Sequence, residues 1–393
     1  MTSSSQKQSR VLSFHYLLHF LSSGLYIPFF PLFYERAGFS SSQIALLHSL
    51  SSLCLCFVPV LLGYYIAHRN LPMKKTYTIV VVLSFLTSIA FAIPEAGFLL
   101  FFFVALSHAL CRVCVNPLLD SLALNFSSET GKPYGHLRLW GSVGFMLTCL
   151  VGGIMIDYSP LFFALAHSAF YLFQIPACSM IDSSENSAGT VMKFQFQEYS
   201  RHLPFYFIAF FLTLSHGPYY VFFTIFLEKE VQIEPVWFGA FWVFGVLSET
   251  LMMRKYRSFF SGFDLKGGIK RCASILKVCL LFTALRWLAL AFLRDPVLLF
   301  LTQSLHAFSY GAYHLACMDY LEVNFSPSQR PLAVSLYIST SFGLGGLFGM
   351  NLSGQLLDLM GYQNLFLACS LIALLTILLP AFFQEEKTSS CPS

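Results

Sequence analysis

Twelve apolar runs, each long enough to cross a lipid bilayer as a helix, divide this chain of 393 residues. A helix needs about 20 residues to cross a hydrocarbon core roughly 30 Å thick. Charged residues make up only 11 % of the chain, against roughly a quarter in soluble domains. The sequence therefore predicts an all-α membrane protein with twelve transmembrane helices. The runs cover 11–34, 42–67, 76–94, 97–121, 138–157, 160–181, 204–227, 235–254, 272–293, 296–320, 331–357 and 362–383.

Two short segments, about two hundred residues apart, repeat the same pattern of side chains. The segments 120–127 and 319–326 share Asp, Leu, Asn, Phe and Ser at equivalent positions. Gly153 and Gly354 form a second pair, because each is followed four residues later by an aspartate. An offset near half the chain length predicts two parallel, pseudo-symmetric six-helix bundles built by duplication, as in proteins that move solutes across membranes.

The longest hydrophilic connection, 182–203, is rich in serine and lies between the sixth and seventh runs. It separates a predicted N-terminal bundle over 1–181 from a C-terminal bundle over 204–393. A flexible linker at this point would let one bundle rock against the other. The sequence contains no G-x-x-x-x-G-K-[ST] motif, which argues against an ATP-driven pump.

Lys and Arg are distributed unequally between the two sides of the predicted membrane. Seventeen of the 23 fall in the loops on the side of the N-terminus, while only Arg36, Lys229 and Arg294 fall in the opposite loops. Cytoplasmic loops carry such an excess of positive charge. We therefore predict a multi-pass protein of the cytoplasmic (inner) membrane, with both termini and the linker in the cytoplasm.

Several ionisable side chains lie inside the apolar runs, where a charge costs about 3 kcal/mol on insertion scales and needs a physical reason. We interpret Lys277 as a residue whose long stem lets the ammonium reach the inner interface. The partner of Arg112 is not evident. The others are Asp120, Arg138 at the start of the fifth run, Glu249, Arg286 and Asp319, with the imidazoles of His216, His306 and His314.

Two runs carry rings and imidazoles at helical spacing, so that they share one helix face. The seventh run contributes His216, Tyr219, Tyr220 and Phe223, and the tenth His306, Ser309, Tyr310, Tyr313 and His314. Such stripes usually pack against other helices, but recurring hydroxyls and imidazoles also suit a partly wet cavity, and both interpretations stay open. If the stripes line a wet cavity, the expected substrate-binding residues are His216, Tyr220, Tyr313 and His314. The glycines between 343 and 349 are expected to permit close helix contact.

Several local motifs are shared with a known family of membrane proteins. The first run contains Gly24-Leu-Tyr26-Ile-Pro28-Phe-Phe-Pro, and 134–145 reads Tyr-Gly-His-Leu-Arg-Leu-Trp-Gly-Ser-Val-Gly-Phe. Both resemble the lactose permease branch of the major facilitator superfamily. The second motif is still closer to the phenylpropionate permeases, as are Leu-Arg286-Trp, Leu-His306 and His-Leu-Ala from 314. The resemblance covers nearly the whole chain and implies the major facilitator fold.

The resemblance also implies roles for particular residues. In the lactose permease pattern, a carboxylate of the fourth span and an arginine eighteen residues later bind the substrate, and Asp120 and Arg138 have this spacing. Phe145 falls where that pattern has a stacking tryptophan, and Tyr26 of the first-span motif joins the expected substrate-binding residues. We therefore expect Asp120 and Arg138 to form a charge pair that exchanges partners with the substrate.

The second half of the pattern concerns proton coupling. Glu249, Arg286 and His306 match residues that carry substrate binding and proton coupling in the lactose permease pattern. The chain departs from it at Ser309, where the sugar symporters have a glutamate, and at Gln303, where they have a lysine. The phenylpropionate permeases also lack the glutamate, so their branch is the nearer one. Glu249 is then the expected proton carrier; the alternative is a fixed Glu249–Arg286 ion pair that only holds two helices together.

The sequence as a whole predicts a secondary transporter, not an enzyme: a proton symporter of a small organic solute, acting as a monomer by alternating access. An aromatic carboxylic acid such as a phenylpropionate is favoured, with a sugar or nucleoside as the alternative. A receptor or sensor on a transporter scaffold is a further alternative. The proton gradient is the expected energy source, with no cofactor and no nucleic-acid partner. Cys111-x-x-Cys114 has no second pair at ligand spacing, so we expect helix packing rather than a metal site.

Overall fold

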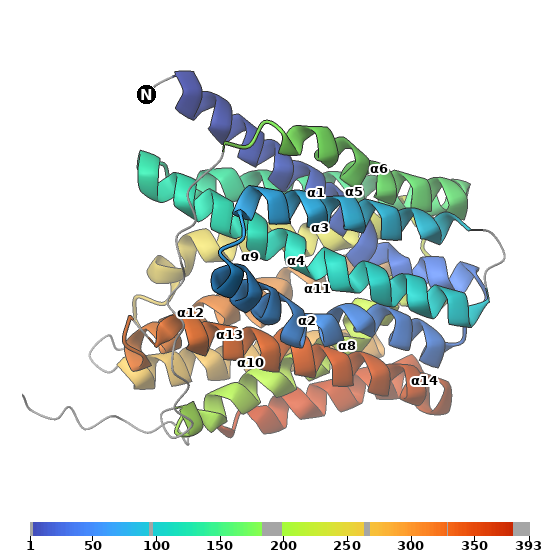
Figure 1. Ribbon diagram of the computed structural model, residues 1–393. Coiled ribbons are helices and arrows are strands. Elements are labelled where there is room, and N and C mark those ends of the chain that lie inside the picture. The colour runs from blue at the N-terminus through green and yellow to red at the C-terminus, as the bar shows by residue number, and fades with distance from the viewer. Residues whose placement is uncertain (1–2, 94–96, 183–198, 263–267, 328, 380–393) are drawn as a thin grey trace, which may run out of the picture.

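The computed structural model describes residues 3–93, 97–182, 199–262, 268–327 and 329–379, and these residues contain helices but no strand. Helices of the first half lie above those of the second in Figure 1, with α2 and α9 at the boundary. The first half comprises α1 (Ser3–Arg36), α2 (Ser41–Arg69), α3 (Met73–Ile89), α4 (Phe98–Thr130), α5 (Tyr134–Tyr158) and α6 (Pro160–Cys178). The second comprises α8 (Leu203–Lys229), α9 (Pro235–Phe259), α10 (Gly268–Phe292), α11 (Pro296–Thr302), α12 (Tyr313–Asn324), α13 (Arg330–Ile338) and α14 (Gly346–Thr376).

Ten helices in the described residues are long and apolar enough to cross a membrane. The last of them, Arg330–Thr376, contains two of the predicted spans, because the chain bends inside α14 at Gly361 (φ 70°, ψ 171°). Only glycine adopts such angles without a steric penalty. The predicted span 296–320 is not among the ten because it is divided into short pieces. The last helix counts as two runs, and the divided segment 296–320 adds one more. The described helices therefore correspond to the twelve predicted runs.

Two of these spans are not regular α-helices. Between α11 and α12 the chain forms a 3₁₀ turn, η2 (Gln303–Leu305), and a π-helical segment, η3 (Ala307–Ala312). A second π-helical segment, η4 (Ser339–Gly345), joins α13 to α14. A π segment inserts an extra residue into a helical turn, and such segments are frequent at functional sites. Hydrophobic periodicity carries no signal for such an insertion.

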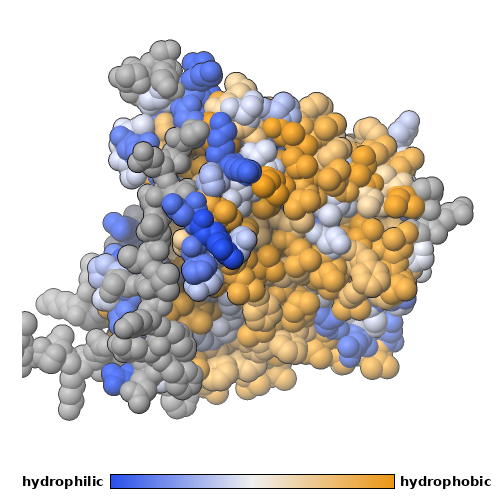
Figure 2. All heavy atoms as spheres, in the orientation of Figure 1, coloured by the Kyte–Doolittle hydropathy of each residue, from blue (hydrophilic) through white to orange (hydrophobic). Residues whose placement is uncertain are grey.

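The face of the molecule shown in Figure 2 is apolar over a broad band, with hydrophilic residues gathered toward the ends of the helices. Large apolar side chains such as Leu99, Phe173 and Leu251 are more than half exposed. Water would make such exposure costly, whereas lipid tails are as apolar as these side chains. The protein is a multi-pass membrane protein, and the bilayer is its lateral partner.

The two halves meet at the end of the molecule opposite to the N-terminus. Arg36 forms an ion pair with Glu228, Lys229 forms one with Glu35, and Ser41 donates a hydrogen bond to Asp358 at 2.7 Å. All of them except Asp358 lie at the ends of α1, α2 and α8 that the topology predicts to be outside. Asp358 lies inside α14, close to its bend at Gly361.

The repeated glycines of the sequence lie in these contacts between halves. A Cβ on Gly153 of α5 would collide with the carbonyl of Pro235 at the start of α9, and a Cβ on Gly354 of α14 would collide with Ala45 of α2. Gly239 of α9 likewise lies against the carbonyl of Cys149. Helix backbones approach this closely only where a side chain is missing. The duplicated motif therefore marks two equivalent helix crossings, α5 with α9 and α14 with α2.

The glycine-rich stretch on the eleventh span also packs as expected. Gly343 lies against Cys56 of α2, whereas Gly345 and Gly349 lie against the backbone of α8 at Phe210 and Leu214. Added Cβ atoms would overlap with these neighbours. The prediction that these glycines permit close helix contact is confirmed.

The cytoplasmic position of the linker and tail stays a prediction, because 183–198 and 380–393 lie outside the described residues. Reporter fusions inserted at Asn186 and after Gln384 are expected to read as cytoplasmic, since the positive charge of the loops is concentrated on that side. Activity of a phosphatase reporter, which requires export, at either position would contradict the twelve-span topology. A fusion in the short loop after Arg294 serves as the matched control and should read as external.

Candidate functional site

Arg286 on α10 is completely buried within the second half. Its guanidinium donates hydrogen bonds to Oε1 of Gln303 (2.8 Å) and to the hydroxyl of Ser309 (3.3 Å). It lies 4.2 Å from the ring centroid of Tyr219 and 5.1 Å from that of Trp287, within range of a cation–π interaction. Its Nε has no partner among the described residues. All of these partners are neutral, so they hold the cation without neutralising it.

His306 connects Arg286 to Glu249 of α9. The imidazole Nδ1 lies 3.0 Å from Nη1 of Arg286, and its Nε2 lies 3.4 Å from Oε2 of Glu249. Because a guanidinium can only donate, Nδ1 must accept, and the proton of the neutral imidazole is then on Nε2, facing the carboxylate. The three residues expected to cluster do lie together. However, no ion pair joins Glu249 to Arg286 in the part of the chain that the structure describes, because the imidazole stands between them.

The π-helical segment η3 accounts for this close approach. It begins directly after His306 and brings the backbone of Gly311 against α9, where an added Cβ would lie 3.3 Å from Cα and Cγ of Glu249. Such a distance is tighter than most Cβ contacts, so a side chain at this position would force Glu249 to shift slightly. The side chain of Glu249 stays 18 % exposed, which leaves its carboxylate accessible while the imidazole holds it.

A column of stacked rings extends from this cluster along the tenth span. The rings of His306 and Tyr310 have centroids 5.4 Å apart and those of Tyr310 and His314 6.0 Å apart, with interplanar angles of 21° and 5°. His314 also lies 3.3 Å from the hydroxyl of Tyr337 through Nδ1. Tyr313, expected on the same stripe, is instead buried in the hydrophobic core of the second half. The extra residue of η3 changes which side chains share a face.

The predicted stripe on the seventh span is divided in the same way. His216 is buried, its Nδ1 lies 2.8 Å from the carbonyl of Leu212, and its ring packs edge-on against Trp287 at 4.7 Å. Tyr220 is partly exposed and lies 6.1 Å from His216, ring to ring. Phe145 on α5 is also partly exposed. Tyr220 and Phe145 are therefore partly exposed, whereas His216 is buried against Trp287.

Asp120 on α4 does not form the predicted charge pair with Arg138. Its carboxylate accepts hydrogen bonds from the hydroxyls of Tyr16 (2.6 Å) and Tyr134 (2.8 Å) and from the amide of Asn116 (2.9 Å). No ion pair of Asp120 occurs in the described ranges. Asp120 and Arg138, eighteen residues apart, lie on the successive helices α4 and α5. The carboxylate of Asp120 is nevertheless already satisfied by two tyrosine hydroxyls. Asp319, its repeat partner, accepts similarly from Tyr256 at 2.9 Å.

Arg138 on α5 lies over aromatic rings of α1 instead. Its guanidinium carbon is 4.2 Å from the ring centroid of Phe20 and 5.7 Å from that of Tyr16. Gly141 provides the space, since a Cβ there would lie 2.8 Å from both the guanidinium and Phe20. Arg138 also lies close enough to Glu249 of the other half to interact with it electrostatically. It is therefore a partly exposed cation that faces the second half.

Arg138→Lys is expected to lower substrate affinity strongly while the protein still inserts and folds. A guanidinium can hold a carboxylate or vicinal hydroxyls at two points and stack on Phe20 at the same time, which an ammonium cannot copy. Equilibrium binding to purified protein measures the effect, with Arg201→Lys at an exposed position as the control. Unchanged affinity in Arg138→Lys would mean that Arg138 only anchors α5 at the inner interface.

A polar cluster in the first half was not predicted, apart from Arg112 and Tyr26. Arg112 lies 4.2 Å from the ring centroid of Tyr26, whose hydroxyl is 3.1 Å from that of Ser51. Four buried imidazoles on α1, α2, α4 and α6 surround this pair: His19, His48, His108 and His167. His108 and Arg112 are spaced i, i+4, and this spacing was the one available signal, because the other imidazoles come from separate helices.

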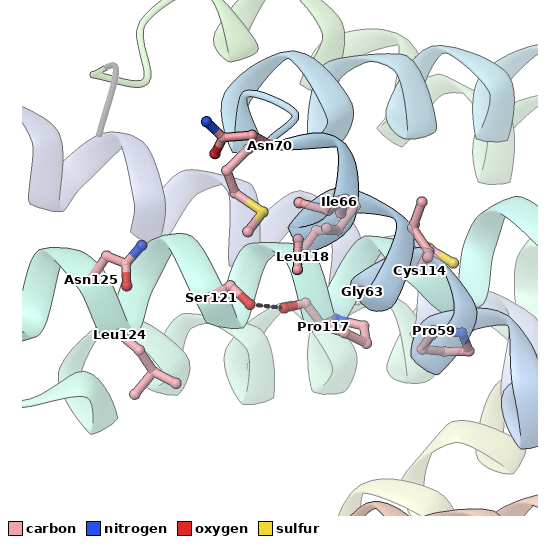
Figure 3. A pocket seen from close by; sticks show the side chains of 13 residues that line it. Pro59, Gly63, Ile66, Asn70, Cys114, Pro117, Leu118, Ser121, Leu124 and Asn125 are labelled. Carbon is pink, nitrogen blue, oxygen red and sulfur yellow. Dashed lines mark hydrogen bonds between the residues drawn. The ribbon is translucent and has the colours of Figure 1, made fainter. Parts of the chain in front are cut away.

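An apolar cavity of about 380 Å³ lies between α2 and α4, apart from these clusters. Figure 3 shows Pro59 and Gly63 on one side and Pro117, Ser121 and Asn125 on the other. The hydroxyl of Ser121 donates to the carbonyl of Pro117 at 2.9 Å, so it is already satisfied. No ionisable carboxyl, imidazole or guanidinium side chain lines this cavity. It is a gap between bent helices rather than a binding site for a polar solute.

Comparison with known proteins matches this architecture. Residues 10–368 match the model of the MFS_1 like family. The maltose permease of Geobacillus stearothermophilus is 26 % identical over 391 residues, covering 96 % of this chain and 95 % of that protein. The "Probable 3-phenylpropionic acid transporter" of Escherichia coli (strain K12) is 25 % identical over 395 residues, covering 97 % and 98 %. Both relatives are named as transporters and neither as an enzyme.

A solved structure shares the fold at lower sequence similarity. The crystal structure of the nucleoside transporter NupG superposes with a TM-score of 0.82 at 17 % identity, covering 98 % of this chain and 100 % of that one. At this identity the similarity concerns the fold alone. It agrees with the all-helical arrangement described above.

Proposed function

Because the chain belongs to the MFS_1 like family of membrane transporters, we propose that it is a proton-coupled symporter of a small organic anion, with an aromatic carboxylate favoured. In this proposal the protein resides in the cytoplasmic membrane as a monomer with both termini inside. The bundles over 1–181 and 204–393 rock about the linker over 182–203 to expose the site to each side in turn.

The observation that supports an anionic substrate is the neutral environment of Arg286. A buried charge is costly unless it is paired, and the partners of this guanidinium are an amide, a hydroxyl, an imidazole and two rings. The glutamate of the sugar symporters is Ser309 here. A substrate carboxylate would supply the missing negative charge, and a guanidinium can hold it with two parallel hydrogen bonds.

The rings around the cluster support an aromatic substrate. His306, Tyr310 and His314 form a stack, and Tyr220 lies nearby with part of its surface exposed. Stacked or edge-on aromatic pairs contribute about 1 kcal/mol beyond the burial of their area. A phenyl group beside these rings would place its carboxylate toward Arg286.

The 3.4 Å contact between Nε2 of His306 and the carboxylate of Glu249 suggests how protons are coupled. When Arg286 binds a substrate anion, its hold on Nδ1 of His306 weakens, and the imidazole can change which nitrogen carries the proton. That change would alter the donor facing Glu249 and with it the proton affinity of the carboxylate. Substrate and proton are thus linked through one imidazole.

A sugar or nucleoside symporter is the second candidate. This candidate is favoured by the similarity of the chain to proteins named as maltose and sucrose permeases and as a putative nucleoside transporter. Hydroxyl-rich solutes would use the same neutral donors and acceptors, Gln303 and Ser309. Among the described residues, no carboxylate pairs with Arg286, and this favours the anion.

Uptake by proteoliposomes under an imposed pH gradient tests the proposal. Labelled 3-phenylpropionate should accumulate when the outside is acidic, and a protonophore should abolish the accumulation. Maltose and uridine, supplied in parallel, should not accumulate. Accumulation of either neutral solute without the acid would overturn the proposed substrate class, and acid uptake that ignores the pH gradient would overturn the coupling.

A further inference from the structure

Arg112 is a second cation without a counter-charge, and it lies in the first half. Among the described residues it takes part in no ion pair and no hydrogen bond, and its Nε is buried without a partner. Its guanidinium carbon is 4.2 Å from the ring centroid of Tyr26, and the side chain is partly exposed. No carboxylate of the described residues compensates this charge, although it is located within a membrane span.

Arg112 and Arg286 each lie on one of two equivalent tyrosine rings in the two halves. Tyr26 and Tyr219 are 193 residues apart, as are Gly24 and Gly217 two positions earlier. Arg112 and Arg286 each lie 4.2 Å from the centroid of one of these equivalent rings. They come from different spans, the fourth and the ninth, so the shared feature is the cation on the ring rather than a conserved position of the arginine.

The imidazoles extend the correspondence. His108 precedes His306 by 198 residues, and Thr87 precedes Arg286 by 199. In the first half, the hydroxyl of Thr87 lies 3.2 Å from Nδ1 of His108. The equivalent contact in the second half is the one of 3.0 Å between Arg286 and Nδ1 of His306. Both halves therefore contain an imidazole, a tyrosine ring and a guanidinium on that ring.

Unsatisfied polar atoms also gather around Arg112. His19 and His48 are each only 4 % exposed, and the Nδ1 atom of each has no partner in the described part of the chain. The ring of His48 stacks on that of Tyr26 at 5.4 Å, and both imidazoles interact electrostatically with Arg112. A buried polar atom without a partner is costly, so these atoms are arranged for a ligand that can accept hydrogen bonds.

We propose that Arg112, His19 and His48 form a second carboxylate-binding site, so that the substrate is a dicarboxylate held by Arg112 in one half and Arg286 in the other. This inference rests on the proposed function and specifies its substrate class. An anion that contacts one guanidinium in each half would draw the halves together at the level of the two tyrosine rings. A monocarboxylate would leave Arg112 uncompensated.

Calorimetric titration of the full-length purified protein tests the inference. The probes are 3-phenylpropionate and its ortho-, meta- and para-carboxylated derivatives, which share the ring and one acid group. We expect at least one diacid to bind about tenfold more tightly than the monoacid, as one further charge-assisted hydrogen bond predicts. If no diacid exceeds the monoacid, the second site does not exist, although the proposed function stands.

Variants show where the added affinity arises. Arg112→Gln should reduce diacid affinity about tenfold more than monoacid affinity, and His48→Phe should reduce the diacid preference without removing a charge. Cys111→Ala, adjacent on α4, should keep the wild-type ratio. If both Arg112→Gln and His48→Phe retain that ratio, or if chloride alone saturates the site and the diacids gain nothing, the inference is overturned. Binding of maltose or uridine in place of every acid would overturn the proposed function as well.

Discussion

Arg286→Lys is expected to abolish substrate binding and transport, with an affinity loss of about 100-fold or more. The ammonium of lysine cannot reach Gln303, His306 and a substrate carboxylate together, because it lacks the planar fork of donors. Two charge-assisted hydrogen bonds of about 1.5 kcal/mol each correspond to this loss. Binding of 3-phenylpropionate to purified protein is the measurement.

The matched control for this substitution lies on the same helix. Lys277 is exposed on α10, so Lys277→Arg tests whether a changed cation on this helix impairs insertion or folding. It should bind substrate as the wild type does. If Arg286→Lys binds with wild-type affinity, the guanidinium holds Gln303 and His306 in place but does not contact the substrate, and the anionic substrate loses its main support.

Glu249→Gln is expected to abolish accumulation driven by the pH gradient while substrate exchange at equal concentrations continues. The amide keeps the size of the side chain and can still accept a hydrogen bond from Nε2 of His306, but it does not titrate. Exchange requires the site to alternate with substrate bound, whereas net accumulation requires a proton to be carried. Both rates are measured in the same proteoliposomes.

Glu322→Gln is the control for the loss of a carboxylate, because Glu322 on α12 is well exposed and lies near the predicted inner side. It should retain accumulation. If Glu249→Gln accumulates substrate against its gradient, this residue does not carry the proton, and His306 or His216 becomes the candidate. If exchange is lost as well, Glu249 binds substrate or supports the fold rather than only coupling.

The local resemblance predicted which residues of the second half would gather, but not the order of their contacts. Glu249, Arg286 and His306 were expected together, and they are. The direct contact between Glu249 and Arg286 was not found, because π-helical geometry after His306 brings the imidazole between them. A π segment arises from backbone hydrogen bonds and packing, and no pattern of side-chain types announces it.

The first half was less accessible to sequence reasoning. Asp120 and Arg138 have the right spacing to meet, yet Tyr16 and Tyr134 take the carboxylate, and Phe20 takes the guanidinium. Two of these partners, Tyr16 and Phe20, lie on α1, which local spacing does not relate to Asp120 and Arg138. The imidazoles around Arg112 are single residues in separate apolar runs. From the sequence, each of them is therefore interpreted as a residue that only packs between helices.

By itself, the sequence determined the number of spans, the division into two repeated halves and the expected side of the loops. These follow from quantities that add along the chain: apolar length, charge in loops and similarity at a fixed offset. Only the tertiary structure decided which polar groups neutralise one another. Hydrogen bonds depend on distances of about 3 Å between residues far apart in sequence, and they change with one inserted residue or one missing Cβ. The glycines at 153, 239, 311 and 354 and the segment η3 set those distances here.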